Sequence, residues 1–171
     1  MNNMVSAASG LDVLREKFSR IVIFFTWFNV FLVIGTAWVV GNVSFVTMCG
    51  GALLLGVAAT ATWVRFGIGV ETRLATAMSL AGLAALFVAA LHTPNVEASY
   101  QLDGHMYFFA VLAVLTGWVD WRALVAYAGV VAVHHLGLNF AMPWAVFPAG
   151  ADFGRVVFHA IIVVAEVAAL W

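Results

Sequence analysis

Charged residues are scarce in this sequence. Asp, Glu, Lys and Arg make up 9% of its 171 residues and hydrophobic residues 65%, whereas a typical soluble domain is about 25% charged. Such a chain cannot cover a surface that faces water, so we expect an integral membrane protein with the lipid bilayer as its main partner. The net charge of −1 provides no basic surface, which excludes nucleic acid as a partner.

Cysteine is almost absent as well. The single Cys49 excludes an internal disulfide framework and any metal site built on paired cysteines. The sequence also lacks a GxSxG nucleophile motif, a phosphate-binding glycine loop and an HExxH motif. We therefore expect a binding module and not an enzyme.

Long apolar runs dominate what is present. A helix needs about 20 apolar residues to cross the bilayer core, and six runs approach that length: 21–40, 45–64, 74–91, 106–118, 123–140 and 156–171. The fourth run reaches spanning length only if its helix begins nearer Asp103. We predict an all-α, polytopic membrane protein. Residues 1–20 are predicted as a juxtamembrane segment with a short amphipathic helix, and residues 21–171 as a six-transmembrane-helix bundle.

Basic residues predict the orientation of the bundle. Six of the seven precede the first span or lie in the connections between spans two and three and spans four and five: Arg15, Lys17, Arg20, Arg65, Arg73 and Arg122. The positive-inside rule makes this side cytoplasmic, together with both termini. Trp171 ends the sequence at the inner interface without a basic anchor, so we expect the sequence to stop where a cytoplasmic domain begins.

All five histidines are predicted near the outer surface of the membrane. His92 ends the third span and His105 begins the fourth, while His134 and His135 lie one to two turns before the outer end of the fifth. His159 lies one turn into the sixth span. A polar group in hydrocarbon costs free energy unless it has a partner, so imidazoles at one depth on several helices predict a shared site. His92, at a helix end, is interpreted as an interfacial residue.

Three further polar residues extend this picture. Asp103 lies two residues before His105 of the fourth span. It is expected to act either as a further ligand of the site or as the N-cap of the fourth helix. Asn139 lies one turn after His135 and shares its helix face. We expect it either to belong to the site or to form a hydrogen bond between helices. Glu166 lies two turns deeper than His159, about 10 Å along the axis, and an ionisable group at that depth indicates a functional site.

The first candidate occupant is a transition metal ion. Imidazole suits copper, zinc and iron, and a carboxylate can complete the coordination shell. The candidate ligands are His105, His134 or His135, and His159, with Asp103 as a fourth ligand or as a group that orients a ligand.

Two alternatives remain open at this point. Haem could lie between His135 and His159, with its edges against the aromatic residues Tyr107, Phe108, Phe109 and Phe158, and it would be b-type because the sequence lacks a c-type attachment motif. A proton path from the outer histidines to Glu166 would instead suit a proton-coupled transporter, although the inner halves of the spans offer no ionisable residues to continue it.

Several blocks of the sequence resemble a known family. The run DGHMYFFAVLAVLTGWVDWRALVAYAGVVAVHHLGLNF, followed by VFPAGADFGRVVFHAIIVVAE, resembles the N-terminal multi-span membrane region of a group of bacterial methyl-accepting chemotaxis proteins and related transducers. The opening REKFSRIVIFFTWFNV is similar to the start of that region. The resemblance implies a membrane-embedded sensor in the bacterial inner membrane, with a cytoplasmic signalling domain in cis.

These observations lead to one working hypothesis. The chain is expected to be the sensory module of a chemoreceptor-like transducer, with its ligand inside the membrane because no large domain lies outside it. Metal occupancy would change the packing of the fourth, fifth and sixth helices, and the sixth would pass the displacement to the signalling domain. A homodimer is compatible with this plan.

Overall fold

The computed structural model describes residues 2–95, 97 and 99–171, with side chains described from Gly10 onward except at 96 and 98. These residues form α-helices and short 3-10 helices and contain no strand. The elements are α1 (Asn2–Val40), α2 (Phe45–Phe66), α3 (Val70–Ala90), α4 (Gln101–Leu115), η2 (Thr116–Trp118), α5 (Trp121–Ala141), η3 (Pro143–Ala145) and α6 (Phe153–Leu170). The all-α class is therefore confirmed.

Five helices in the described residues are long and apolar enough to cross a membrane: α1, α2, α3, α5 and α6. They indicate a multi-pass membrane protein. The fourth helix begins before Asp103, as its predicted function as a span requires, but α4 has 15 residues. That length corresponds to about 22 Å, against a hydrocarbon core of about 30 Å. Six crossings therefore stay a prediction.

Short polar side chains begin three of the helices. Ser44 caps α2, Asp120 caps α5 and Asp152 caps α6, each accepting a hydrogen bond from a backbone N–H of the first turn. Gly67, with a φ of 57°, ends α2 in a conformation that side-chain-bearing residues rarely adopt. At the N-terminus, α1 continues without a break through residue 20, so the expected separate amphipathic helix is part of a single long helix.

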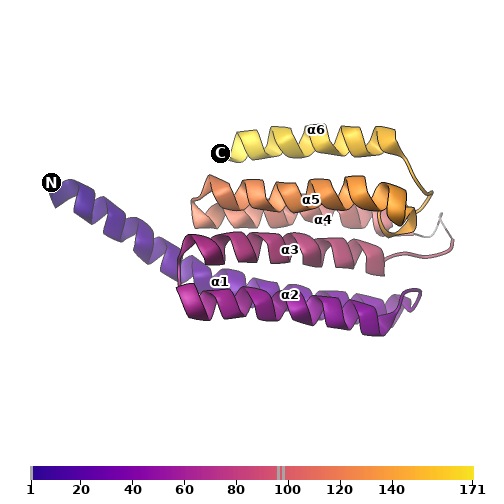
Figure 1. The fold of residues 1–171 in the computed structure, drawn as a ribbon, viewed down its shortest axis with the longest axis horizontal. Coiled ribbons are helices and arrows are strands. Elements are labelled where there is room, and N and C mark those ends of the chain that lie inside the picture. The colour runs from indigo at the N-terminus through magenta and orange to yellow at the C-terminus, as the bar shows by residue number, and fades with distance from the viewer. Residues whose placement is uncertain (1, 96, 98) are drawn as a thin grey trace.

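The helices run antiparallel along one axis (Figure 1). Both termini and the α2–α3 and α4–α5 connections lie at one end, and we call this the basic end because it carries Arg15, Arg65 and Arg122. The other connections lie at the opposite end, which we call the histidine end. The N-terminal part of α1 projects beyond the rest of the bundle.

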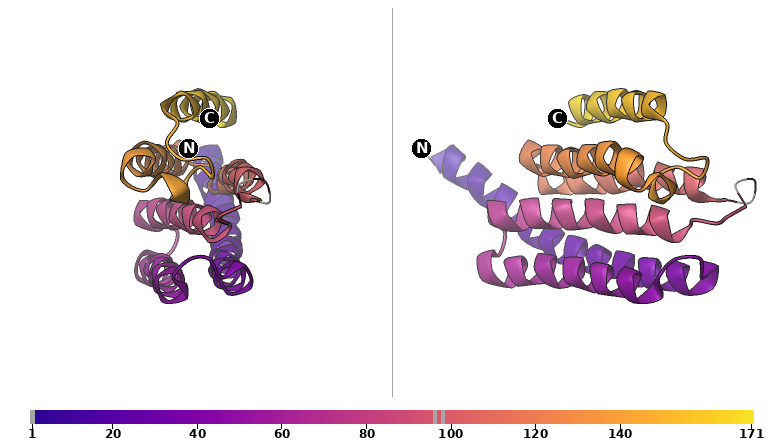
Figure 2. Two further views of the ribbon diagram at one scale, coloured as in Figure 1. Left: turned by 90° about the vertical axis from the view of Figure 1, so that its right-hand side faces the viewer. Right: turned by 45° about the vertical axis from the view of Figure 1, so that its right-hand side comes forward.

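Helix α3 is the central helix and α6 the outermost (Figure 2). In the apolar window of α3, 61% of the residues are buried, against 11% for α6. Helix α3 packs on α1, α2, α4 and α5, whereas α6 packs mainly on α5. Because few contacts hold α6, it is the helix most easily displaced.

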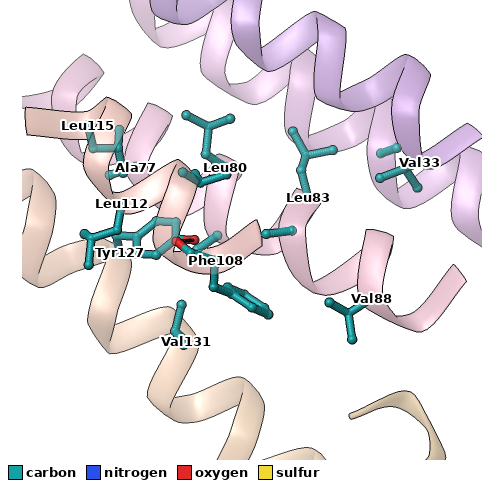
Figure 3. Close-up of a cluster of buried hydrophobic side chains, with 14 of the residues drawn as sticks. Val33, Ala77, Leu80, Leu83, Val88, Phe108, Leu112, Leu115, Tyr127 and Val131 are labelled. Atoms are coloured by element: carbon teal, nitrogen blue, oxygen red, sulfur yellow. Dashed lines mark hydrogen bonds between the residues drawn. The ribbon is translucent and has the colours of Figure 1, made fainter. Parts of the chain in front are cut away.

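The core between α4 and α5 lies directly below the histidine end. Phe108 and Leu112 of α4 lie against Tyr127 and Val131 of α5, with Leu80 of α3 beside them (Figure 3). The Tyr127 hydroxyl donates to the Phe108 carbonyl at 2.9 Å. This packing sets the rotation of both helices about their axes, and therefore the direction of the histidines above.

Candidate functional site: three histidines from three helices

Three histidines from three helices meet at the histidine end. His105 of α4, His135 of α5 and His159 of α6 have ring centroids 5.5, 5.7 and 5.4 Å apart. We call these residues the histidine triad. His105 and His135 are each only 4% exposed. The structure thus brings together three of the histidines that the sequence placed at one depth.

Each ring of the triad is oriented by the same backbone contact. The Nδ1 atoms of His105, His135 and His159 lie 2.7, 2.9 and 2.8 Å from the backbone carbonyl four residues earlier. A carbonyl oxygen can only accept a hydrogen bond, so Nδ1 must carry the proton in all three rings. Each Nε2 is consequently a lone-pair acceptor.

Two of the three Nε2 lone pairs in the triad are buried and lack donors among the described residues. Nε2 of His105 and Nε2 of His135 are buried and have no hydrogen-bond partner in the part of the chain that the structure describes. A buried acceptor left unpaired costs about 1–3 kcal/mol. Neighbouring acceptors that lack donors point to a ligand able to accept electron pairs.

The spacing of the triad rings matches that of imidazoles around one metal ion. Three centroids about 5.5 Å apart surround a point about 3.2 Å from each, and a metal–N bond of about 2.0–2.1 Å puts the ion at about that distance from a ring centre. Within the described residues, however, no group of three His, Cys, Asp or Glu side chains is placed so that it could hold a metal ion. The ring centroids of the triad are close together, but the side chains as they stand do not form a metal site.

An aromatic side chain covers the triad. The Phe147 ring lies 5.8, 6.2 and 5.9 Å from the rings of His105, His135 and His159, and it is 1% exposed. Phe108 lies 6.0 Å from His105 and 5.5 Å from His135. These two rings surround the triad with hydrocarbon, which strengthens electrostatic interactions inside it.

The other two histidines do not contact all the rings of the triad. His134 lies beside His135, at 5.1 Å, and against Phe108, at 5.8 Å, and its half-buried side chain has an unpartnered Nε2. The His92 ring packs against Trp144, with centroids 5.1 Å apart and ring planes tilted by 49°. The sequence left His134 and His135 as alternatives, and the structure brings His135 into the triad.

Two further predicted residues lie away from the triad. Asp103 is exposed and lines a separate cavity beside Tyr107 and Gly104. The N-cap of α4 is Tyr100, so the alternative reading of Asp103 as the cap is wrong. The Tyr107 hydroxyl donates to Oδ1 of Asn29 in α1 at 2.9 Å, which directs Tyr107 toward the opposite side of α4.

Asn139 positions the start of α6. It is 1% exposed, and its Oδ1 accepts the backbone N–H of Asp152 at 2.7 Å. Asp152 in turn caps α6 through the N–H of Arg155, whose carbonyl holds Nδ1 of His159. Asn139 therefore acts on the third histidine through the backbone of α6, and the hydrogen bond expected of it runs to the connection that leads into α6.

Two residues that support the site have no distinctive sequence pattern. Gln101 is fully buried. Its side-chain NH₂ donates to the Trp144 backbone carbonyl at 2.8 Å, and its backbone carbonyl accepts the hydrogen bond from Nδ1 of His105. Phe147 lies in the connection between α5 and α6. The sequence shows Gln101 only as a polar residue before an apolar run and Phe147 only as part of a proline-bounded loop.

Glu166 lies deeper in the bundle, seven residues after His159 on α6. One of its carboxyl oxygens is buried without a hydrogen-bond partner, and it forms no ion pair among the described residues. The sequence predicted a functional site at Glu166, and the structure places this residue outside the triad.

A groove of about 750 Å³ runs between α5 and α6, next to the triad. His135 and His159 line one part of it, and nearly all of the rest is apolar, including Val131, Leu136 and Val164. Such a groove suits a hydrophobic ligand or a lipid chain.

Comparisons of this chain with protein-family models, with curated proteins and with solved structures find no match. Functional interpretation therefore depends on the geometry of the site and on its chemistry.

Proposed function

We propose that this chain is a membrane-embedded sensory module that binds a transition metal ion through Nε2 of His105, His135 and His159. The observation that carries the proposal is the shared state of the triad: each Nδ1 proton is committed to a backbone carbonyl, and the buried Nε2 atoms of His105 and His135 have no hydrogen-bond partner among the described residues. Metal-bound histidines in proteins commonly have this second hydrogen bond, which orients the ring.

The charge of the site favours monovalent copper over zinc or divalent iron. The three ligands are neutral, and the two phenylalanines that cover them provide no counter-charge. Since the cost of burying an ion rises steeply with its charge, a dication would need a further anionic ligand, such as a carboxylate or a hydroxide, in the same site. Imidazole is a suitable ligand for copper.

Signalling would follow from the weak packing of α6. Coordination ties α6 to α4 and α5 at the histidine end, while the outermost helix is otherwise held mainly by α5. Metal binding would thus shift α6, and a signalling domain joined to its C-terminal end would receive the displacement. The ion transmits a signal only if it binds one position of α6 more tightly than another.

A haem group is the second candidate, supported by the apolar groove of about 750 Å³ beside His135 and His159. An iron bound between two imidazoles, with metal–N bonds of about 2 Å, separates their ring centres by about 6.3 Å. The observed separation is 5.4 Å. Haem would require α6 to move outward by about 1 Å. The smaller ion requires rotation of the rings, and because the two nitrogens of a ring move together, the Nδ1 hydrogen bonds to the backbone carbonyls would have to adjust as the ion binds.

Metal analysis of the purified protein tests this proposal. The protein in detergent is loaded with Cu(I), Zn(II) or Fe(II), washed, and assayed by elemental mass spectrometry together with an absorption spectrum. We expect one copper per chain and no Soret band. A Soret band with iron and no copper would support haem instead.

Variants assign the ligands. His105→Ala, His135→Ala and His159→Ala are each expected to abolish stoichiometric copper binding, whereas His134→Ala and His92→Ala, which remove histidines outside the triad, should retain it. Circular dichroism shows whether each variant keeps its helical content. Full occupancy in a folded His159→Ala protein would refute the three-helix site.

A further inference from the structure

A second polar cluster lies at the basic end, far from the triad along the helix axes. A cavity of about 380 Å³ opens between Arg15 in the N-terminal half of α1, the start of α5 and the end of α6, and its walls are Arg15, Thr116, Val119, Asp120, Trp121, Arg122, Leu124, Leu170 and Trp171. One water molecule occupies about 30 Å³, so the cavity has room for a larger polar group.

Positive charge dominates this cavity. Asp120 is paired with Arg73 at 2.6 Å and with Arg122 at 3.0 Å, so its single negative charge is shared between two guanidinium groups. Arg15 adds a third positive charge. Even with Asp12, which is exposed one turn before Arg15 on α1, positive charges outnumber negative ones.

Two of the arginines keep unused donors at the cavity. Arg15 donates through Nε to the Trp118 carbonyl at 3.0 Å and through Nη2 to the Val119 carbonyl at 2.9 Å, which holds its guanidinium in place and leaves Nη1 without an acceptor among the described residues. In the same part of the chain, the side chain of Arg122 donates through Nε alone, so both of its terminal nitrogens are available. Guanidinium groups suit phosphate because their paired N–H groups match its oxygens.

The remaining walls match the interfacial layer of a membrane. Trp121 and Trp171 stack with ring centroids 5.0 Å apart and planes at 4°, and tryptophan is enriched at the level of lipid headgroups. Leu124 and Leu170 continue the wall toward the spans. A ligand here would therefore meet arginines at its polar end and hydrocarbon beyond it.

We propose that this cavity binds the phosphate of an anionic phospholipid in the membrane leaflet at the basic end. The phosphate lies between Arg15 and Arg122, and the glycerol and acyl chains follow Leu124 and Leu170 into the bilayer. Basic pockets between transmembrane helices bind anionic headgroups in this way. Because the cavity is lined by α1, by the start of α5 and by the end of α6, the lipid also holds the loosely packed α6 at this end.

Lipid titration with native mass spectrometry tests this inference. The protein in neutral detergent is titrated with phosphatidylglycerol, with phosphatidylcholine and with inorganic phosphate alone. We expect one tightly bound phosphatidylglycerol, at least tenfold preferred over phosphatidylcholine, and no competition from inorganic phosphate at the same concentration. Full competition by inorganic phosphate would overturn the lipid assignment and indicate a site for a free anion.

Charge-matched variants separate this cavity from general attraction to a basic surface. Arg122→Gln and Arg15→Gln are expected to lower the affinity for phosphatidylglycerol at least tenfold, and Arg122→Lys to lower it less because it keeps the charge. Arg65→Gln removes the same charge from an exposed residue that does not line the cavity, and it should change the affinity less than twofold. Equal losses in Arg65→Gln and Arg122→Gln would overturn the proposal.

Discussion

Two aspartates that begin helices allow the contribution of a buried ion pair to be measured. Asp120 caps α5 and pairs with Arg73, and the two side chains are 3% and 8% exposed. Asp152 caps α6 and pairs with Arg155, and these side chains are 45% and 41% exposed. The two sites share a cap and an arginine partner. They differ in burial and in the second, half-exposed arginine, Arg122, that also pairs with Asp120, so replacing each aspartate by alanine compares a mainly buried pair with an exposed one.

The expected losses of stability differ severalfold. Removing a helix cap costs about 1 kcal/mol, and removing one partner of a buried ion pair costs about 3–5 kcal/mol because the other charge remains uncompensated. Asp120→Ala should therefore lose about 4–6 kcal/mol. Asp152→Ala should lose about 1–2 kcal/mol, since an exposed pair contributes at most about 1 kcal/mol. Asp120→Asn keeps the cap, so its loss in the free energy of unfolding should be about 1 kcal/mol smaller than that of Asp120→Ala.

Reversible unfolding in mixed micelles, followed by circular dichroism, measures these differences in the free energy of unfolding. Losses of similar size in Asp120→Ala and Asp152→Ala would refute the argument, because burial would then have no effect on the strength of the pair. No loss of stability in Asp120→Ala would show that the Arg73 guanidinium becomes hydrated or finds another partner once Asp120 is removed.

The same pair predicts a dependence on pH. Burial alone raises the pKa of Asp120, but the hydrogen bonds from the side chain and backbone of Arg122 and the charge of Arg73 outweigh it and hold the pKa below its usual 3.8. A carboxyl whose pKa is lower in the folded protein stabilises the fold above its unfolded pKa and loses that effect as the pH falls through the folded value. The stability difference between the parent and Asp120→Asn should thus be constant from pH 8 to 5 and shrink below pH 4.

Two further substitutions test packing and the support of the triad. Gly117→Ala places a methyl group against the Phe18 ring and should lower the free energy of unfolding by about 1–3 kcal/mol, whereas Gly129→Ala, where nothing lies within 4 Å, should cause no loss. Asn139→Ala removes the acceptor of the Asp152 N–H and should weaken copper binding by about tenfold in a competition titration, as loss of a residue that supports a metal ligand does; Asn139→Asp keeps an acceptor oxygen and should retain affinity. An unchanged copper affinity in Asn139→Ala would show that the hydrogen bond from Asp152 to Asn139 is not needed to place His159 for binding.

Neighbouring residues show where sequence reasoning reached its limit. His134 and His135 are equivalent in depth, and only the rotation of α5, set by packing of Tyr127 and Val131, brings the second into the triad. Asp103 and His105 are close in sequence, but two residues on a helix point in directions about 200° apart. Asp103 is accordingly exposed while His105 is buried.

The amino-acid sequence by itself determined the helical class, the positions of the apolar helices to within about five residues except for the start of α1, and the shared depth of the histidines. These properties follow from composition and from distance along a helix of known rise. Tertiary structure decided which rings meet, that Phe147 covers them, that Asn139 directs α6, and that arginines of distant segments share a cavity. Those outcomes depend on the rotation and the neighbours of each helix, which side-chain packing sets and the linear order of residues does not display.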